Sequence, residues 1–176
     1  MVLVGIGAIP NIQLADSIGL ECDNGIKTDQ YCRTSIPHIL AVGDCTSSFN
    51  TLFNREFRLE SVPNALAQSK VASSSIVGND LFNSEMPWFW SDQYDLKLQM
   101  AGLSSGYDEC HIIGDIDSAE FVACYGKEGH LIAVDSVNQS KQFMLFKKAL
   151  GNGFKLEMSL IKDKNFQPDS IFSGSN

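Results

Sequence analysis

The chain has 176 residues, a formal net charge of −8 at pH 7 and 44% hydrophobic residues. This hydrophobic share is too high for a disordered protein, and the length suffices for one large domain or two small ones. The negative charge argues against nucleic acid as a partner, because phosphate binding needs clustered lysine and arginine. No apolar stretch is long enough to span a membrane and no signal peptide is recognisable, so we expect no membrane partner and a cytoplasmic location.

The five cysteines and three histidines form no familiar pattern. The cysteines are odd in number and lack CxxC spacing, and the histidines lack the spacing of metal ligands. We therefore expect reduced, structural thiols and no metal site.

The first residues predict parts of a parallel α/β sheet. Residues 2–6 are a short apolar run, typical of a strand covered on both faces, and such a strand needs neighbouring strands. Residues 13–18 predict a short helix that ends at Gly19. A tight turn at residues 23–25 then leads to a strand over residues 26–29.

A second buried strand is predicted over residues 39–42, ending at Gly43 and Asp44. A carboxylate directly after such a strand lies at the carboxyl end of the sheet, where open α/β sheets bind ligands. Its oxygens are suited to accept hydrogen bonds from ligand hydroxyl groups. The alternative is an ordinary turn aspartate, which is the more common role of an isolated Gly-Asp pair.

The next segment predicts a polar loop through Arg58 and then a helix over residues 64–77. Ser61 is a suitable N-cap, and Pro63 fits the first turn of a helix. The helix is rich in small residues and could pack closely on a sheet. Its N-terminal dipole end can hold partial negative charge, although every helix has such an end.

After residues 79–87 the pattern changes to that of a separate antiparallel α+β domain. Alternating apolar and polar residues indicate half-buried strands, with a hairpin turn at Glu128-Gly129. A helix over residues 143–150 closes this unit, and residues 151–176 are expected to be a poorly ordered tail. The predicted strands are residues 96–100, 110–113, 120–125 and 131–137.

Three motifs, in this order, resemble a known flavoprotein family. They are TSIPHILAVGDC, RLESVPNALAQ and PWFWSDQYDLKLQMAGL. They resemble the C-terminal half of the FAD-dependent ferredoxin reductases that serve oxygenases, which include the putidaredoxin, rubredoxin and rhodocoxin reductases. VLVGIGAIPN is similar to the end of that family's NAD domain, and DNGIKTDQYCRTS to the stretch that leads back into its FAD domain. The resemblance covers about residues 1–150.

The resemblance implies an α/β fold, in which the C-terminal part of an FAD/NAD-binding parallel-sheet domain precedes a small α+β antiparallel-sheet reductase C-terminal domain. Residues 1–10 would be the last strand of the NAD-binding domain, residues 11–80 the C-terminal part of the FAD-binding domain, and residues 87–150 the reductase C-terminal domain. GIGAIP is no dinucleotide fingerprint, because it lacks the third glycine and the helix that must follow. We therefore expect a fragment of about two fifths of an enzyme, whose N-terminal half is missing.

The resemblance also implies a flavin site. It puts the ribityl chain of FAD against Asp44, beside Gly43, and the pyrimidine edge of the flavin at Val62 and Asn64. The dipole end of the helix would stabilise the negative charge of a reduced flavin. Pro63 stands where the family usually has glutamine, which removes one backbone N–H from this helix start.

The aromatic segment at residues 88–90 reads as turn-like, and the resemblance puts Trp90 beside the isoalloxazine ring. An aromatic wall there would exclude water and offer the ring a flat apolar surface. The alternative, that Trp88 and Phe89 only anchor the C-terminal domain on the FAD domain, stays open. Glu60 would help to position the nicotinamide, and Gly7 would line the pyridine nucleotide cleft.

The resemblance implies an FAD-dependent oxidoreductase that passes electrons from NAD(P)H through FAD to an iron–sulfur ferredoxin or a rubredoxin. No catalytic side chain is expected, because the flavin carries the chemistry. The related disulfide reductases are disfavoured, because the sequence has neither their CxxxxC pair nor their C-terminal histidine motif.

The alternative function is a non-catalytic remnant or protein-interaction module without flavin activity. Acidic ferredoxins dock on basic patches, and the net charge of this chain opposes such a patch. The basic residues that could contribute to one are Arg55, Arg58, Lys141, Lys147 and Lys148.

Overall fold

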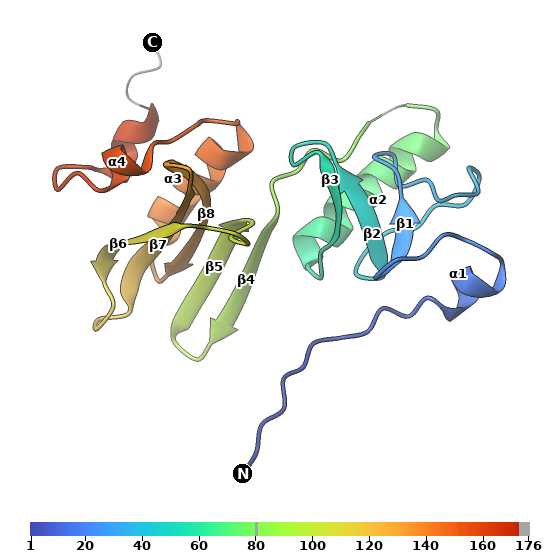
Figure 1. Ribbon diagram of the computed structural model, residues 1–176, viewed down its shortest axis with the longest axis horizontal. Coiled ribbons are helices and arrows are strands. Elements are labelled where there is room, and N and C mark those ends of the chain that lie inside the picture. Colours follow the sequence, from blue (N-terminus) through green and yellow to red (C-terminus); the bar gives the residue numbers. More distant parts are fainter. Residues whose placement is uncertain (80, 173–176) are drawn as a thin grey trace. The chain divides into compact units, whose positions relative to one another are not determined.

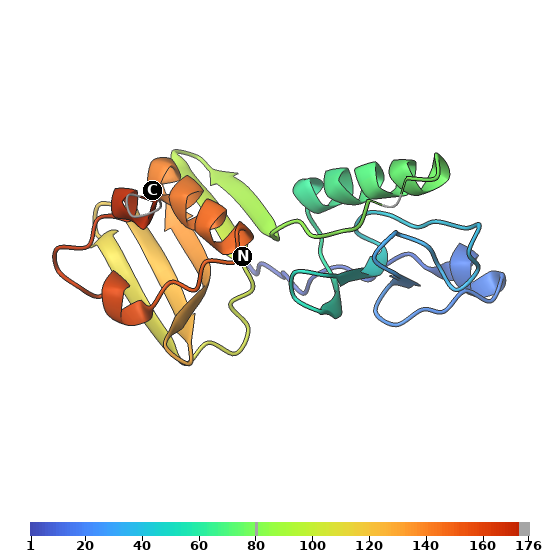
Figure 2. The ribbon, with the colours of Figure 1, turned by 90° about the horizontal axis from the view of Figure 1, so that it is seen from above.

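The computed structural model describes residues 1–79 and 81–172 and divides into two compact units (Figures 1 and 2). The first unit is Met1–Glu85, and the second begins at Met86. The first contains a small mixed sheet with a helix and the second a five-stranded antiparallel sheet. The predicted fold class is thus confirmed.

The first unit is built on a three-stranded sheet in the order β1-β2-β3. Strands β1 and β2 are parallel, and β3 pairs antiparallel with β2. Helix α2 lies along one face of the sheet (Figures 1 and 2), and its Val71 and Ala72 pack with Cys32 and Leu40 in a small core. The elements are α1 (Gln13–Ser17), β1 (Ile26–Thr28), β2 (Thr46–Asn50), β3 (Arg55–Arg58) and α2 (Val62–Ile76).

The start of α2 follows the predicted capping pattern. Ser61 has an extended backbone, with φ −159° and ψ 145°, and its hydroxyl accepts a hydrogen bond from the Asn64 N–H at 3.2 Å. Pro63 lies in the first turn, where no intrahelical N–H is needed. The predicted N-cap is confirmed, and the helix begins two residues before the predicted range.

Two predicted strands of this unit do not form. Residues 2–6 lie in an exposed segment without strand pairing, since no described strand lies beside them. Residues 39–42 make one isolated bridge, between Leu40 and Arg33. Strands β2 and β3 form instead, where the sequence predicts a polar loop. Phe53 and Phe57 pack edge to face there, with ring centroids 5.8 Å apart.

The second unit is a five-stranded antiparallel sheet in the order β4-β5-β8-β7-β6. The predicted strands are confirmed, and the turn at Glu128-Gly129 has positive φ at both residues, as a tight hairpin requires. Residues 88–90 belong to an edge strand, so their turn-like reading is wrong. The strands are β4 (Trp88–Gln93), β5 (Leu96–Gly102), β6 (Glu109–Asp115), β7 (Glu120–Lys127) and β8 (His130–Val137).

Helix α3 (Ser140–Gly151) packs on one face of this sheet through a buried apolar side (Figure 2). Phe143, Phe146 and Ala149 are completely buried on that side. Burial of two phenylalanines contributes several kcal/mol, of the order of 2–3 kcal/mol for each side chain. The predicted helix is confirmed and begins three residues earlier than expected.

The residues after Gly151 are ordered as far as the structure describes them. They contain helix α4 (Met158–Ile161) and a 3-10 helix, η1 (Pro168–Phe172). Met158 and Ile161 are buried, and the Leu131 N–H of β8 donates to the Leu156 carbonyl at 2.8 Å. The prediction of a poorly ordered tail is therefore wrong for these residues, and its last four, 173–176, lie outside the described residues.

Helices of the described chain are too short or too polar to cross a membrane. The same described residues contain no group of three or more acidic, histidine or cysteine side chains that could hold a metal ion.

Candidate functional site

The Gly43-Asp44 turn lies at the start of a strand, not at the end of one. Asp44 is two residues before Thr46, where β2 begins parallel to β1. The sequence placed it at the carboxyl end of a strand, which is wrong because residues 39–42 form no regular strand here. The Asp44 side chain is exposed, and no described side chain bonds to its carboxylate.

A buried hydrogen-bond cluster fixes this turn from the side of α2. The Gly43 N–H donates to Oε1 of Gln68 at 2.6 Å, and Gly43 has a φ of +86°. The Thr46 hydroxyl donates to the Gly43 carbonyl at 2.8 Å and lies 3.2 Å from the same Gln68 oxygen. Gln68 is 2% exposed and Thr46 is fully buried. Sequence reasoning missed Gln68, although a glutamine among the small residues of α2 was a visible signal.

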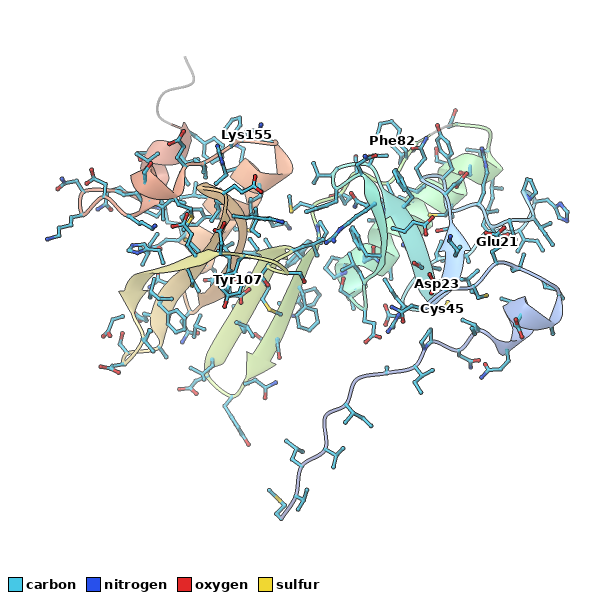
Figure 3. All side chains as sticks on the ribbon, in the orientation of Figure 1. Glu21, Asp23, Cys45, Phe82, Tyr107 and Lys155 are labelled. Carbon is cyan, nitrogen blue, oxygen red and sulfur yellow. The ribbon has the colours of Figure 1, made fainter. Side chains whose placement is uncertain are left out.

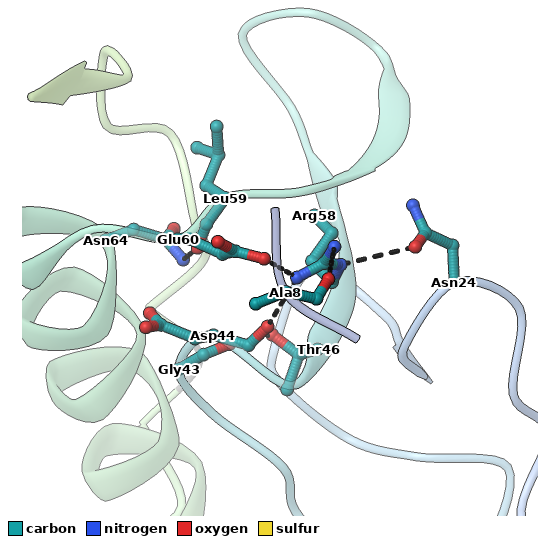
Figure 4. Close-up of polar contacts among 9 residues, drawn as sticks. All are labelled: Ala8, Asn24, Gly43, Asp44, Thr46, Arg58, Leu59, Glu60 and Asn64. Atoms are coloured by element: carbon teal, nitrogen blue, oxygen red, sulfur yellow. Dashed lines mark hydrogen bonds and ion pairs between the residues drawn. The ribbon is translucent and has the colours of Figure 1, made fainter. Parts of the chain in front are cut away.

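Arg58 gathers contacts from four separate segments around the same turn (Figure 4). Its guanidinium forms an ion pair with Glu60 and donates to the Asp44 carbonyl at 3.4 Å. It also donates to Oδ1 of Asn24 at 3.3 Å and to the Ala8 carbonyl at 3.4 Å. The Arg58 side chain is only 14% exposed. Sequence reasoning considered Arg58 only as part of a basic patch, because three of its four partners lie 14, 34 and 50 residues away in the chain.

The N-terminus of α2 offers fewer open amides than a typical helix start. Pro63 has no N–H, and the Asn64 N–H is already bound by Ser61. The Asn64 side chain donates to the Leu59 carbonyl at 3.1 Å, which ties the helix start to the end of β3. The Val62 amide makes no hydrogen bond with any described residue, and its side chain is exposed.

Glu60 and Gly7, the residues expected near a nicotinamide, lie in different surroundings. The Glu60 carboxylate is exposed and held by Arg58. Gly7 lies in the exposed N-terminal segment with a φ of +81°, next to Ala8, which Arg58 contacts.

In the second unit, the two tryptophans of β4 stack on one face of the strand. The Trp88 and Trp90 rings have centroids 5.3 Å apart and planes 30° apart. Trp88 also meets Phe143 of α3, at 6.3 Å between centroids, and Nζ of Lys147 lies 3.6 Å from its ring centre. Trp88 thus fixes α3 to the sheet within its own unit, while Trp90 remains 38% exposed and Phe89, the intervening residue, is also exposed.

An open hollow of about 240 Å³ lies beside the exposed tryptophan. One of its lining residues is Gln99, whose Oε1 is buried and has no hydrogen-bond partner among the described residues. The lining residues are Trp88, Trp90, Asp92, Lys97 and Gln99.

The basic residues proposed for a docking patch are engaged with neighbours in their own units. Lys147 lies over Trp88, and Lys148 lies over Phe172 at 4.7 Å. Lys141 pairs with Asp169 at 3.0 Å. Three of the five basic residues therefore take part in the packing around α3.

A half-buried carboxylate on β8 was not foreseen. The Tyr125 hydroxyl donates to Oδ2 of Asp135 at 2.8 Å, and the Tyr107 ring, labelled in Figure 3, packs edge to face on Tyr125. Burial raises the pKa of Asp135, and the hydrogen bond from Tyr125 opposes that rise. Burial and the neighbouring carboxylate both raise the pKa of Tyr125.

The cysteines are all free thiols. Burial raises the pKa of Cys32 and of Cys124 to about 12, so both stay protonated and unreactive at neutral pH.

Both units match families of known proteins. Residues 1–69 match the pyridine nucleotide-disulphide oxidoreductase family, and residues 88–170 match the family described as reductase C-terminal. Together these matches extend over most of the chain.

Several curated reductases are similar in sequence. Putidaredoxin reductase CamA of Pseudomonas putida is 39% identical over 175 residues, which are 99% of this chain and 42% of that protein. Rhodocoxin reductase of Rhodococcus erythropolis is 39% identical, over 94% of this chain and 39% of its own length. The chain thus spans about two fifths of these relatives.

Solved structures agree with the sequence matches. The ferredoxin reductase for the CYP199A2 system of Rhodopseudomonas palustris is 36% identical, with a TM-score of 0.89, over 94% of this chain and 41% of that one. The covalent putidaredoxin reductase–putidaredoxin complex has the same TM-score at 38% identity, over 96% of this chain and 40% of the matched one. These findings confirm the resemblance that the three sequence motifs predicted. Over its two matched regions, the chain corresponds in sequence and fold to the C-terminal portion of putidaredoxin- and rhodocoxin-type ferredoxin reductases.

Proposed function

We propose that this chain serves as the C-terminal part of an FAD-dependent reductase that passes electrons from NAD(P)H to a ferredoxin- or rubredoxin-type carrier. The observation that carries the proposal is the match to putidaredoxin reductase over 99% of the chain, across both units. The covalent complex of a similar reductase with putidaredoxin supports a small electron carrier as the partner.

The residues around the Gly43-Asp44 turn fit the polar parts of FAD. The exposed Asp44 carboxylate can accept hydrogen bonds from ribityl hydroxyl groups. Gly43, whose positive φ favours glycine, places no side chain beside this carboxylate. The Val62 amide, at the positive end of α2, can donate to the pyrimidine edge with Asn64 beside it. Pro63 leaves this edge with one donor fewer. When bound, FAD would accept a hydride and release single electrons.

We also propose that Trp90 provides a flat apolar surface for the isoalloxazine ring. Support comes from its exposure and from the stacked Trp88 ring behind it, which Lys147 and Phe143 hold in place. Stacking on a fixed neighbour lets Trp90 present one face without a further loss of conformational freedom.

For the nicotinamide, we propose that Glu60 takes part in positioning and that Gly7 lines the cleft. Arg58 holds the Glu60 carboxylate in one orientation and contacts the backbone next to Gly7. The same ion pair keeps Glu60 from repelling the negatively charged dinucleotide at full strength.

A protein-interaction module without flavin is the second candidate. The exposed apolar side chains of residues 2–6 favour it, because such a segment is suited to contact another surface. Flavin binding separates the two candidates, since a module would bind none.

The test joins this chain to the N-terminal segment of putidaredoxin reductase that precedes the matched region. The proposed function predicts a purified protein that retains FAD, measured by flavin absorbance after gel filtration. Asp44→Ala should weaken FAD binding, while Asp117→Ala, an exposed residue of the second unit, serves as the control. A folded joined protein without any affinity for FAD would favour the interaction module.

A further inference from the structure

The buried carboxamide of Gln68 is placed to control the turn that carries Asp44. We propose that Gln68 is a positioning residue, which sets the orientation of the Asp44 carboxylate toward FAD without touching the cofactor. This inference rests on the proposed function, because it concerns how the same site is held.

Gln68 bonds to the residue directly before Asp44. Its Oε1 accepts the Gly43 N–H at 2.6 Å, and the Thr46 hydroxyl, which closes the other side of the turn, lies 3.2 Å from the same oxygen. The Thr46 N–H donates to the Gly43 carbonyl at 3.0 Å, so the turn is closed on itself and attached to α2 at one atom. Gln68 therefore attaches the Gly43 side of the turn to the helix, whereas β1 holds the other side, where the Ile26 N–H donates to the Cys45 carbonyl at 2.8 Å.

The Asp44 side chain has no comparable support of its own. No described side chain bonds to its carboxylate, and the Arg58 contact to its carbonyl is long, at 3.4 Å. The position of the Asp44 carboxylate is therefore set by the backbone conformation of the turn. The hydrogen bond from Gly43 to Gln68 is thus the link that ties the residue before Asp44 to α2, as the bond from Ile26 to the Cys45 carbonyl ties the residue after it to β1.

Gln68 is itself firmly placed. It lies in the second turn of the 15-residue helix α2, and it is 2% exposed. Its backbone carbonyl accepts a contact from the Cys32 thiol at 3.6 Å, and Cys32 is completely buried. The side chain can therefore transmit the position of α2 to the Gly43-Asp44 turn.

The chemistry of the site favours a neutral acceptor. An apolar side chain would leave the Gly43 N–H without its partner, which is costly for a shielded amide. A glutamate would keep the acceptor and add a buried negative charge near the Asp44 carboxylate. Glutamine supplies the acceptor without that charge, so Gln68→Met and Gln68→Glu separate the two effects.

The first experiment measures the dissociation constant of FAD in the joined protein described above. Gln68→Met should raise it about tenfold, the factor that corresponds to the loss of one buried hydrogen bond. In an Asp44→Asn background the same substitution should change it by less than about twofold, since coupled residues are not additive. Val71→Ala, which removes buried volume from α2 away from the turn, should lower the melting temperature and leave the FAD constant unchanged.

Two results would overturn the inference. One is an unchanged FAD constant in Gln68→Met, and the other is an equal rise in the presence and absence of the Asp44 carboxylate. Absence of FAD binding by the unsubstituted joined protein is a different result, which would count against the proposed function itself.

A second experiment needs no flavin. Amide hydrogen exchange of Gly43 in the full 176-residue chain should be faster in Gln68→Met than in the unsubstituted chain. Gln68→Glu should restore the protection, because its carboxylate still accepts the hydrogen bond. Equal Gly43 exchange in all three proteins would show that Gln68 does not hold the turn, whatever the flavin measurement gives.

Discussion

The half-buried Asp135 carboxylate gives the second unit a pH dependence that can be worked out from the structure. Asp135 accepts a hydrogen bond from Tyr125, and its register partners Met100 and Ala123 on the adjacent strands are apolar. Asp135→Asn removes the charge but keeps an oxygen that can accept from the Tyr125 hydroxyl. We therefore expect Asp135→Asn to stabilise this unit at pH 7.

The sign follows from proton binding. Burial raises the pKa of Asp135 in the folded unit above its value in the unfolded chain, which is about 3.9. The folded unit thus binds more protons, and the contribution of Asp135 to stability is fully present below about pH 3.9 and is lost as pH rises through the raised pKa. The gain from Asp135→Asn should accordingly be smallest near pH 4 and largest at neutral pH.

Tyr125→Phe is the complementary change. It removes the donor and leaves Oδ2 of Asp135 without its partner, which should destabilise the unit by about 1–3 kcal/mol. Because Tyr125 and Asp135 are only half-buried and water can replace the donor, the lower end of that range is expected.

Tryptophan fluorescence during urea unfolding is the assay. Both tryptophans of the chain, Trp88 and Trp90, lie in the second unit, so their signal reports that unit. The free energy of unfolding would be compared between pH 4 and pH 7 for the unsubstituted chain and Asp135→Asn. A difference between the two proteins that stays constant across this range would refute the reasoning about the buried carboxylate.

Three further predictions concern the packing and the turn. Phe143→Ala should destabilise the second unit by about 3–5 kcal/mol, because the side chain is completely buried between α3 and the sheet; a loss below about 1 kcal/mol in urea unfolding would contradict this packing. Lys147→Met should cost about 0.5–1 kcal/mol by removing the cation above Trp88, and Lys147→Arg should restore it. Equal stability of the two Lys147 variants would exclude the cation–π contact as the cause. Gly43→Ala should destabilise the first unit by about 1 kcal/mol, since its φ of +86° disfavours a side chain; thermal unfolding followed by far-ultraviolet circular dichroism tests this, with Gly5→Ala, in open space at ordinary φ, as the control.

Local signals predicted most of the secondary structure of the second unit. The alternation of apolar residues predicted its inner strands, and Glu128-Gly129 predicted the hairpin turn, because each of these patterns is contained within a few residues. The tail escaped prediction for the opposite reason. Met158 and Ile161 are buried, and the segment is attached by hydrogen bonds to Gly129 and Leu131, partners that a short, weakly periodic stretch of sequence does not reveal.

The first unit was harder to predict, because its strands depend on distant partners. Residues 39–42 have the composition of a buried strand, but without a neighbouring strand they make one bridge. Strand β2 is rich in serine and reads as a loop, yet it is largely buried between β1 and β3.

The candidate site shows the same limit. Asp44 and the start of α2 were predicted from a motif, whereas the residues that hydrogen-bond to their backbone were not predicted to do so. Gln68 reaches back 25 residues to Gly43, and Arg58 reaches back 50 residues to Ala8. Only the folded chain brings such residues together, so sequence reasoning named the exposed groups and missed those that hold them.

The most direct test of the proposed function is the anaerobic titration of the joined protein with NADH, followed by flavin absorbance. The function predicts that one equivalent of FAD stays bound through gel filtration and is bleached by NADH, and that added ferredoxin restores its colour. A well-folded joined protein that holds no flavin, or whose bound flavin NADH leaves oxidised, would contradict it.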